Sequence, residues 1–299
     1  MNNLNLKTRL ELLKTEYQAL AKKNQTAIKE IALAEVPEMV FHSNAIENST
    51  LTLEDTTDIL VRGQIKKDAS VREIYEAKNL GKVMNLLIEN PHEKLTPMLI
   101  LSLHRILLSG INDDWAGHFR SGDQWVRVGT HIGANPSFVN NLVYELVDNF
   151  NQQDDRELLE KIAYFHAEFE NIHPFPDGNG RIGRVLVNQQ LMQNNLPPII
   201  IRSKNKYTDY YPFFDSFLRT GKANDFQVLF TNLLLESLHK RIAILSGDKI
   251  IPLAEWAKKH KVPQNAISNK AKRQTIPAFR IADRWMVSAS FIDTPDVDL

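Results

Sequence analysis

Residues 173 to 184 read His-Pro-Phe-Pro-Asp-Gly-Asn-Gly-Arg-Ile-Gly-Arg, and the segment before them has apolar residues every three to four positions. The residue before Pro174 is pushed away from helical dihedrals, so a helix from about Glu157 is expected to end near Ile172. The glycines of the run predict a turn, and a second helix is expected to begin near Arg181. The run therefore predicts a loop held between two helices.

This loop has the chemistry of a phosphate site. The free backbone N–H groups and the positive dipole end of the second helix point into the loop, an arrangement that binds anions. Arg181 and Arg184 emerge on one face of that helix. His173 is a candidate base, and Asp177 is a carboxylate of the kind that binds hard metal ions. Each feature alone is common in ordinary turns, but the combination favours phosphate chemistry.

The remaining sequence predicts a mainly helical globular protein. The chain has 299 residues, of which 43% are hydrophobic and 24% charged. It contains no cysteine, which excludes disulfides and thiol nucleophiles and is typical of a reducing cytoplasm. The N-terminus lacks an apolar signal core, and polar side chains interrupt the longest apolar stretch, Met98 to Ile111. We therefore expect a cytoplasmic protein without a membrane partner.

The distribution of charge predicts the domain organisation. Residues 249–286 carry nine Lys or Arg against two acids, a local net charge of +7, and the remainder carries −7. Helical spacing of apolar residues continues up to about residue 246. We expect an N-terminal helical region, a catalytic domain and a small basic domain, with the boundaries 1–60, 61–246 and 249–299.

Residues 117–137 interrupt the helical pattern. Four glycines surround the alternating stretch Trp125-Val126-Arg127-Val128, which predicts a short, exposed β-hairpin. An exposed strand edge can pair with an extended segment of another protein. A plain surface hairpin is the alternative.

The run at 173–184 resembles the signature of the Fic family, His-Pro-Phe-x-Asp/Glu-Gly-Asn-Gly-Arg-x-x-Arg, and it matches every fixed position. The resemblance implies a Fic-type helical bundle with a hairpin flap. It also implies transfer of AMP from ATP to a Ser, Thr or Tyr hydroxyl of a target protein or of the chain itself, with release of pyrophosphate. Such a reaction depends on positioning, a metal ion and charge stabilisation.

The resemblance further implies roles for individual residues. His173 resembles the general base, Asp177 the Mg²⁺ ligand, and Arg181 and Arg184 the phosphate clamps. The residues that resemble the anion hole are Gly178, Asn179 and Gly180. The strand of the flap that would bind a target consists of Trp125, Val126, Arg127, Val128 and Gly129. Tyr210 and Tyr211 resemble residues of the nucleotide pocket, although a tyrosine pair at the start of a helix is more often core.

Upstream, residues 43–48 read Ser-Asn-Ala-Ile-Glu-Asn and resemble the inhibitory motif Ser/Thr-x-x-x-Glu-Gly/Asn of many Fic proteins. Asn48 suits a helix C-cap, so Glu47 would lie where the helix dipole disfavours an anion and a cation would stabilise it. A solvated glutamate is the alternative. We expect Ser43, Glu47 and Asn48 to form an inhibitory segment in which Glu47 pairs with Arg184 in place of the ATP γ-phosphate.

The sequence of the basic domain predicts a helix that begins at Pro252 and a second helix over Gln264–Arg273. It also predicts a hairpin in which Ile276–Ile281 pairs with Arg284–Val287. This order resembles winged helix-turn-helix domains of the excisionase type. Lys270, Lys272 and Arg273 would face phosphates, with Gln264, Asn265 and Asn269 near base edges. DNA is one candidate partner of residues 249–299. The alternatives are an acidic protein partner or a basic surface that is only solvated.

Other functions stay open at the level of the sequence. The same site could remove AMP from a modified protein, with Glu47 activating a water. Kinase-type phosphoryl transfer, as in Doc-like relatives, is disfavoured because those proteins lack the Gly-Asn-Gly-Arg arrangement present here. A DNA-binding regulator that only senses nucleotide is a further alternative. The target protein, its modified residue and the oligomeric state are undetermined, with a homodimer among the candidate assemblies.

Overall fold

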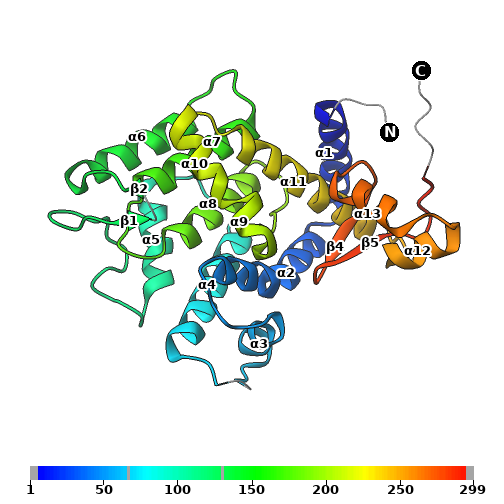
Figure 1. The fold of residues 1–299 in the computed structure, drawn as a ribbon, viewed down its shortest axis with the longest axis horizontal. Coiled ribbons are helices and arrows are strands. Elements are labelled where there is room, and N and C mark those ends of the chain that lie inside the picture. Colours follow the sequence, from blue (N-terminus) through cyan, green and yellow to red (C-terminus); the bar gives the residue numbers. More distant parts are fainter. Residues whose placement is uncertain (1–5, 66–67, 129–130, 294–299) are drawn as a thin grey trace. The chain divides into compact units, whose positions relative to one another are not determined.

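A computed structural model describes residues 6–65, 68–128 and 131–293 of the chain and is mainly helical, as predicted (Figure 1). The chain divides into two compact units. Unit 1 contains Met1–Ala32, Leu196–Ile199 and Thr231–Leu299, and unit 2 contains Leu33–Asn195 and Ile200–Phe230. Residues 173–184 therefore lie in unit 2, and the basic residues 249–286 lie in unit 1.

The division passes through α2 (Gln25–Ile46), which has Pro37 in its interior. A proline there lacks the N–H that would bond to the carbonyl of Leu33, and its ring crowds that turn. Leu33 is also the first residue of unit 2. The expected boundaries at residues 60 and 246 fall elsewhere, because the first 32 residues group with the tail. The expected three-part organisation stays a prediction.

Unit 2 is built around α8 (Asn179–Gln193), whose residues are almost all buried. This helix packs against α4, α5 and α7. The other helical segments that lie wholly in this unit are α3 (Leu53–Thr57), η1 (Asp58–Arg62), α4 (Val71–Glu89), α5 (Pro97–Leu108), η2 (Pro136–Phe138), α6 (Val139–Asn151), α7 (Leu158–Ile172), η3 (Ser203–Asn205), α9 (Lys206–Asp209) and α10 (Tyr211–Thr220).

The loop between α7 and α8 follows the predicted course. Helix α7 ends at Ile172, and His173 takes a left-handed backbone conformation with φ +53°. Helix α8 begins at Asn179, two residues earlier than expected, because Gly178 at φ +86° caps it. Phe175 is fully buried and stacks on the His104 ring with 3.6 Å between ring centroids. The buried ring fixes the loop to the core.

The predicted hairpin is present, with strands shorter than expected. Strand β1 (Arg127–Val128) pairs antiparallel with β2 (His131–Ile132). Trp125 and Val126 precede the strand, although the N–H of Gly133 still donates to the Val126 carbonyl at 3.1 Å. Gly129, the last residue of the predicted strand, lies outside the described residues.

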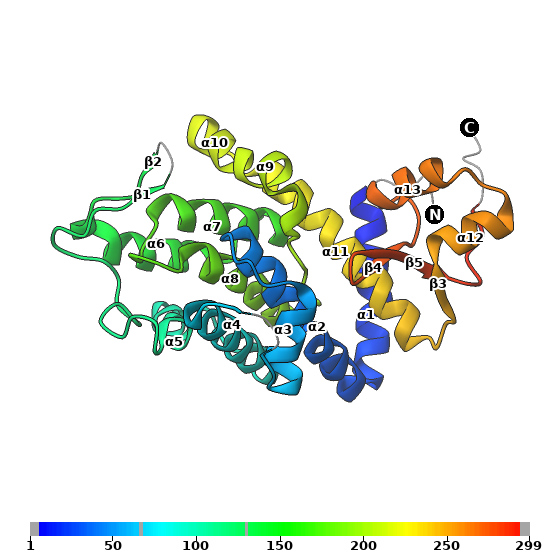
Figure 2. The same cartoon turned by 60° about the horizontal axis from the view of Figure 1, so that its bottom comes forward.

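The predicted order of two helices and a β-hairpin is present in residues 253–288 of unit 1, which also contains α1 (Leu6–Lys23) (Figure 2). Helix α11 (Asn224–Leu245) enters this unit at Thr231. The antiparallel sheet has the strand order β3–β5–β4, and its β3 was not predicted. Helices and strands of the tail are β3 (Ile250–Pro252), α12 (Leu253–His260), α13 (Gln264–Lys272), β4 (Phe279–Ile281) and β5 (Arg284–Ser288).

A small apolar core holds this tail together. Trp256 of α12, Ile267 of α13 and Val287 of β5 are buried in one cluster. The second helix therefore turns its opposite face outward, where Asn265 and Asn269 are exposed. None of the helices in the part of the chain that the structure describes has the length and apolarity of a membrane span.

Candidate active site

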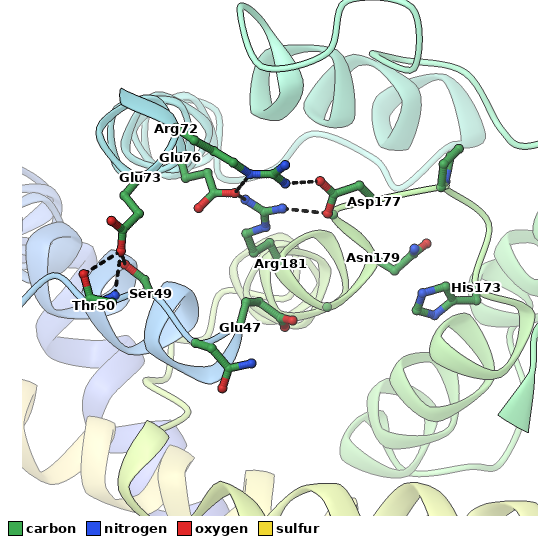
Figure 3. A pocket seen from close by; sticks show the side chains of 14 residues that line it. Glu47, Ser49, Thr50, Arg72, Glu73, Glu76, His173, Asp177, Asn179 and Arg181 are labelled. Carbon is green, nitrogen blue, oxygen red and sulfur yellow. Dashed lines mark hydrogen bonds and ion pairs between the residues drawn. The ribbon is translucent and has the colours of Figure 1, made fainter. Parts of the chain in front are cut away.

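The predicted site residues of the α7–α8 loop line one cavity of about 500 Å³ (Figure 3). The lining also includes Glu47, at the end of α2, and three residues from the first two turns of α4, namely Arg72, Glu73 and Glu76. Three segments that lie far apart in the sequence therefore meet at the N-terminus of α8. Because that end of a helix attracts anions, the cavity is suited to an anionic ligand.

Glu47 and Arg184 form the expected ion pair. A carboxylate oxygen of Glu47 lies 2.8 Å from Arg184 Nη2, and the same guanidinium donates to the Ser43 hydroxyl at 3.0 Å and to its carbonyl at 2.9 Å. The same carboxylate approaches Gly180 so closely that a β-carbon at this position would collide with it. An anionic group thus already lies against the glycine backbone at the start of α8.

The end of α2 is held by contacts that the sequence did not reveal. Asn48 has φ +69°, which confirms the expected cap, and its side-chain oxygen accepts from Lys206 Nζ at 2.7 Å. The same ammonium donates to the carbonyls of Ala45 and Ile46 at 2.9 Å each. A cation at the C-terminus of a helix complements the helix dipole. These contacts keep Glu47 in place.

A ring of four charged groups crosses the cavity (Figure 3). Arg181 Nη2 donates to Asp177 Oδ1 at 2.9 Å, and Arg72 Nη2 donates to Asp177 Oδ2 at 2.5 Å. Arg181 and Arg72 both lie near Glu76 Oε1, at 3.0 and 2.9 Å. Burial alone would raise the pKa of Asp177, but Arg181 and Arg72 hold that pKa below its ordinary value. Asp177 is therefore an anion.

Two nitrogen groups of the Arg181 guanidinium are available as hydrogen-bond donors to a ligand. Only 3% of this residue is exposed, and its Nε and Nη1 groups have no hydrogen-bond acceptor within the described residues. The 3.0 Å approach of Nη1 to Glu76 is an ion pair without hydrogen-bond alignment. Buried donors without acceptors are costly unless a ligand satisfies them. These two donor groups therefore indicate that an anionic ligand binds beside Arg181.

His173 is arranged as a base. Its Nδ1 lies 3.3 Å from the Glu170 carbonyl oxygen, which can only accept, so Nδ1 carries the proton and Nε2 the lone pair. Burial, with a smaller contribution from Arg120, lowers the pKa of His173 to about 4. The imidazole is therefore neutral at pH 7. Glu170 Oε2 lies 3.6 Å from the same Nδ1, and burial raises the pKa of Glu170 to about 8.

Arg120 joins the hairpin to the base and was missed from the sequence. This residue is 1% exposed and donates to the carbonyls of Ile172 at 2.8 Å and His173 at 2.6 Å. It also donates to Gln124 and Ala134, on either side of the hairpin strands. Its partners are backbone carbonyls from separate segments, so no sequence motif could have identified it.

His104 is a second missed residue, and it lies under the loop. Its Nδ1 accepts from the Gly117 N–H at 3.0 Å, so its Nε2 is the donor to the Asp177 carbonyl at 2.9 Å. Burial lowers the pKa of His104 to about 4. A histidine inside the apolar stretch from Met98 to Ile111 was the available signal, since such a group needs hydrogen-bond partners.

The anion-hole residues divide into two kinds. The side chain of Asn179 bonds to both backbone groups of Phe175, at 2.8 Å each, so its amide closes the loop. The backbone of Gly178 and Gly180 still lines the cavity. The main chain of this segment is therefore available to a phosphate.

The two tyrosines do not lie on this cavity. Tyr210 is 3% exposed, and its hydroxyl lies 2.8 Å from His166 Nε2 in an aromatic cluster of the core. Tyr211 donates to the Ile46 carbonyl at 2.7 Å. Neither is among the described residues that line the cavity, so a role in the nucleotide pocket lacks support here and stays a prediction.

The chemistry of Asp177 fits a divalent cation. It is anionic, lies in the cavity beside the anion-binding backbone, and attracts two guanidinium groups. Mg²⁺ is commonly bound by one or two carboxylates together with phosphate oxygens. Glu76 is the nearest second carboxylate of the ring, so the donor set is of the right type for such an ion.

Comparison with known proteins places this site in a family. The model of the Fic/DOC family matches residues 94–191, which include the α7–α8 loop. Protein adenylyltransferase fic-1 of Caenorhabditis elegans is 30% identical over 178 residues, which are 58% of this chain and 34% of that protein. Protein adenylyltransferase Fic of Aedes aegypti is 31% identical over 68% of this chain and 42% of that protein. The chain thus spans about a third to two fifths of these curated relatives.

A solved structure supports the same placement. A Fic domain-containing signalling protein from Bacteroides thetaiotaomicron is 26% identical, with a TM-score of 0.69, and the match covers 81% of this chain and 98% of that one. Residues 94–191, which include the α7–α8 loop, are therefore similar to the Fic/DOC family.

Proposed function

We propose that this chain transfers AMP from ATP to a hydroxyl group of a protein side chain, in a target or in itself. The observation that carries the proposal is the Glu47 carboxylate, which lies on the Gly180 backbone and Arg184 as a phosphate oxygen would. The names of the relatives, protein adenylyltransferases, agree with it.

In the proposed reaction the hydroxyl oxygen attacks the α-phosphorus of ATP, and the neutral Nε2 of His173 takes the hydroxyl proton. The bond between the α-phosphorus and the bridging oxygen breaks, and pyrophosphate leaves with that electron pair. The unpartnered donors of Arg181 and the backbone N–H groups at the start of α8 hold the leaving group. A divalent cation on Asp177 would neutralise phosphate charge.

The inhibitory segment would control this reaction by competition. Glu47 and the γ-phosphate of ATP both need Arg184, so they exclude each other, and Ser43 holds the guanidinium in place. If the closed state is favoured by roughly 2 kcal/mol, only about 3% of molecules bind ATP productively. The hydrogen bond between Lys206 and Asn48 holds the end of α2 in place, and this end of the helix presents Glu47.

The hairpin at 117–137 is the proposed docking element for the target protein. Trp125 is 56% exposed, and Arg127 is also exposed, so the strand offers side chains and backbone to an extended peptide. Arg120 ties this element to His173, which would bring a bound hydroxyl to the base. Val128 and Gly129 complete the strand proposed from the sequence.

The test is intact mass after incubation of the full chain with ATP and Mg²⁺. Glu47→Gly is expected to gain the mass of AMP faster than the wild type, and His173→Ala in the Glu47→Gly background is expected to gain none. Glu54→Gly, a change at an exposed glutamate on α3, should behave as the wild type. Gain of phosphate instead of AMP would contradict the proposal, as would equal rates in the wild type and Glu47→Gly.

A second proposal concerns the tail, which we suggest binds DNA. The exposed cations Lys258, Lys259 and Lys261 of α12 and its C-cap, and Lys272 and Arg273 at the end of α13, have no ion-pair partner in the described part of the chain. Unpaired cations on one small domain suit a polyanion. Lys270, expected to face a phosphate, instead lies 2.8 Å from Asp293 Oδ2, so it is a weaker candidate.

Binding of a labelled mixed-sequence duplex to the full chain, measured by anisotropy at rising salt, tests this second proposal. Affinity should fall steeply with salt, and Lys272→Gln with Arg273→Gln should weaken it. Lys78→Gln with Lys82→Gln removes two exposed cations from α4 as a control. No binding at low salt, or equal loss in both pairs, would remove DNA as the partner.

A further inference from the structure

Each carboxylate oxygen of Asp177 already accepts a hydrogen bond from a guanidinium. Its Oδ1 accepts from Arg181, and its Oδ2 accepts from Arg72 (Figure 3). Arg72 comes from α4, outside the α7–α8 loop, and it belongs to none of the motifs in the sequence. A divalent cation on Asp177 would be repelled by both guanidinium groups, so its binding favours the displacement of one of them.

Exposure identifies which guanidinium can leave. The side chain of Arg181 is 4% exposed and that of Arg72 is 58% exposed. An exposed ion pair contributes little free energy because water replaces the partner, whereas a buried guanidinium that loses its anion is costly. Arg72 also retains Glu76 as a second partner, at 2.9 Å from its Nε. Arg72 is therefore the group that a metal ion would displace.

The backbone around Arg72 is held by hydrogen bonds. Ser70 caps α4, and Glu73 completes the capping box. The Glu73 carboxylate also accepts from the Thr50 N–H at 2.6 Å and from the Thr50 hydroxyl at 2.9 Å, which joins α4 to the segment after α2. These bonds hold the pKa of Glu73 at about 2, against the opposing effect of burial. The first turn of α4 thus holds the backbone of Arg72 by several hydrogen bonds, while its guanidinium is exposed.

We infer that Arg72 is an internal substitute for the divalent cation at Asp177, so that metal binding is a competition between Arg72 and the ion. The guanidinium neutralises the carboxylate when no ion is bound and withdraws to Glu76 when one arrives. Arg72 would therefore reduce the affinity of this site for metal. The inference deepens the proposed function, because it concerns the ion that would accompany ATP.

The test measures the metal alone, without nucleotide. Binding of Mn²⁺ to the full chain, followed by the loss of the free-ion signal in electron paramagnetic resonance, is compared for the wild type, Arg72→Gln and Arg72→Lys. Arg72→Gln is expected to bind Mn²⁺ on the order of three- to tenfold more tightly. The ion no longer has to break the Arg72–Asp177 ion pair, and it is no longer repelled by the guanidinium. Arg72→Lys should stay close to the wild type.

Two controls make the result specific. Asp177→Asn in the Arg72→Gln background should lose the added binding, and Lys78→Gln, which removes an exposed cation from the same helix, should leave Mn²⁺ affinity unchanged. Equal or weaker binding in Arg72→Gln, or a gain that survives Asp177→Asn, would overturn the inference. Titration with a non-hydrolysable ATP analogue tests the proposed function separately, so tighter Mn²⁺ binding without nucleotide binding would remove only the latter.

Discussion

The α7–α8 loop and the basic tail both concentrate positive charge, but the two regions present it in opposite ways. Arg181 and Arg184 are 3% and 5% exposed, and each has an internal carboxylate within 3 Å. Lys272 and Arg273 are exposed and have no ion-pair partner among the described residues. A buried cation can bind one oriented anion tightly, whereas exposed cations create a field that salt screens. Burial, more than charge, distinguishes a reaction site from a docking surface.

The comparison also explains why a carboxylate already lies against Arg184. A buried guanidinium without an anion is costly, so Arg184 needs a carboxylate whenever phosphate is absent. Glu47 supplies it from α2. The same reasoning applies to Asp177 and Arg72, with the charges reversed. Lys272 and Arg273 of the tail need no such internal partners because water already solvates them.

The largest expected effect comes from the base. His173→Ala should lower AMP transfer at least a hundredfold, because no other group takes the proton from the attacking hydroxyl. Affinity for a non-hydrolysable ATP analogue should change little, since the phosphate donors remain. Initial rates of AMP incorporation in the Glu47→Gly background measure the effect. His92→Ala, at an exposed histidine, should keep the full rate, and substantial activity in His173→Ala would exclude this residue as the base.

The next largest effect should follow removal of Arg120. Arg120→Gln removes the guanidinium donor from the carbonyls of Ala134, Ile172 and His173, of which Ile172 keeps the Ala134 N–H, at a cost of about 3 kcal/mol in the free energy of unfolding. AMP transfer should fall as well, because the hairpin loses its link to His173. Urea unfolding and initial rates provide the two measurements, with exposed Arg219→Gln as the matched change. A stable, fully active Arg120→Gln protein would show that this link is dispensable.

Acid should destabilise unit 2 through its buried histidines. Burial lowers the pKa of His104 to about 4 and that of His166 to about 3, against 6.5 in an unfolded chain. Below pH 6.5 these two histidines bind protons in the unfolded chain but stay neutral in the folded protein. The free energy of unfolding therefore decreases as pH falls toward 4. We expect a loss of about 2 kcal/mol per ring at pH 5.

Urea unfolding at pH 7 and pH 5 measures this loss of stability. In His104→Gln the decrease should be smaller by the contribution of one ring. The same decrease in the wild type and the variant would show that His104 takes up a proton in the folded protein.

The smallest effect on catalysis should come from the tail. Lys272→Gln with Arg273→Gln should leave AMP incorporation within about twofold of the wild type, because surface substitutions away from a site change little. The salt dependence of DNA affinity should decrease by about the contribution of two phosphate contacts. Loss of transfer activity in this variant would break the separation between the two regions.

The sequence predicted those parts of the site that depend on local order. The end of α7 at Ile172, the cap at Asn48 and the pairing of Glu47 with Arg184 follow from proline, asparagine and charge at defined spacings. The order of helices and hairpin in the tail also followed from local signals, whereas β3 did not. Its three residues pair with β5, more than thirty residues later, and carry no alternation of their own.

The missed residues share one physical property. Arg120, His104, Lys206 and Arg72 act through backbone carbonyls or charges on segments distant in sequence, and such partners leave no spacing to detect. Tyr210 shows the opposite case, since a polar side chain near a motif became part of the aromatic core. The role of Asn179 also depended on structure, because only the folded loop shows both ends of its amide in use.

Affinity for a non-hydrolysable ATP analogue, measured by calorimetry in the wild type and Glu47→Gly, tests most directly whether Glu47 takes the place of a nucleotide phosphate. If the carboxylate must leave Arg184 before the nucleotide binds, and the closed state is favoured by roughly 2 kcal/mol, Glu47→Gly should bind about thirtyfold more tightly. Equal affinity in the two proteins would contradict the account.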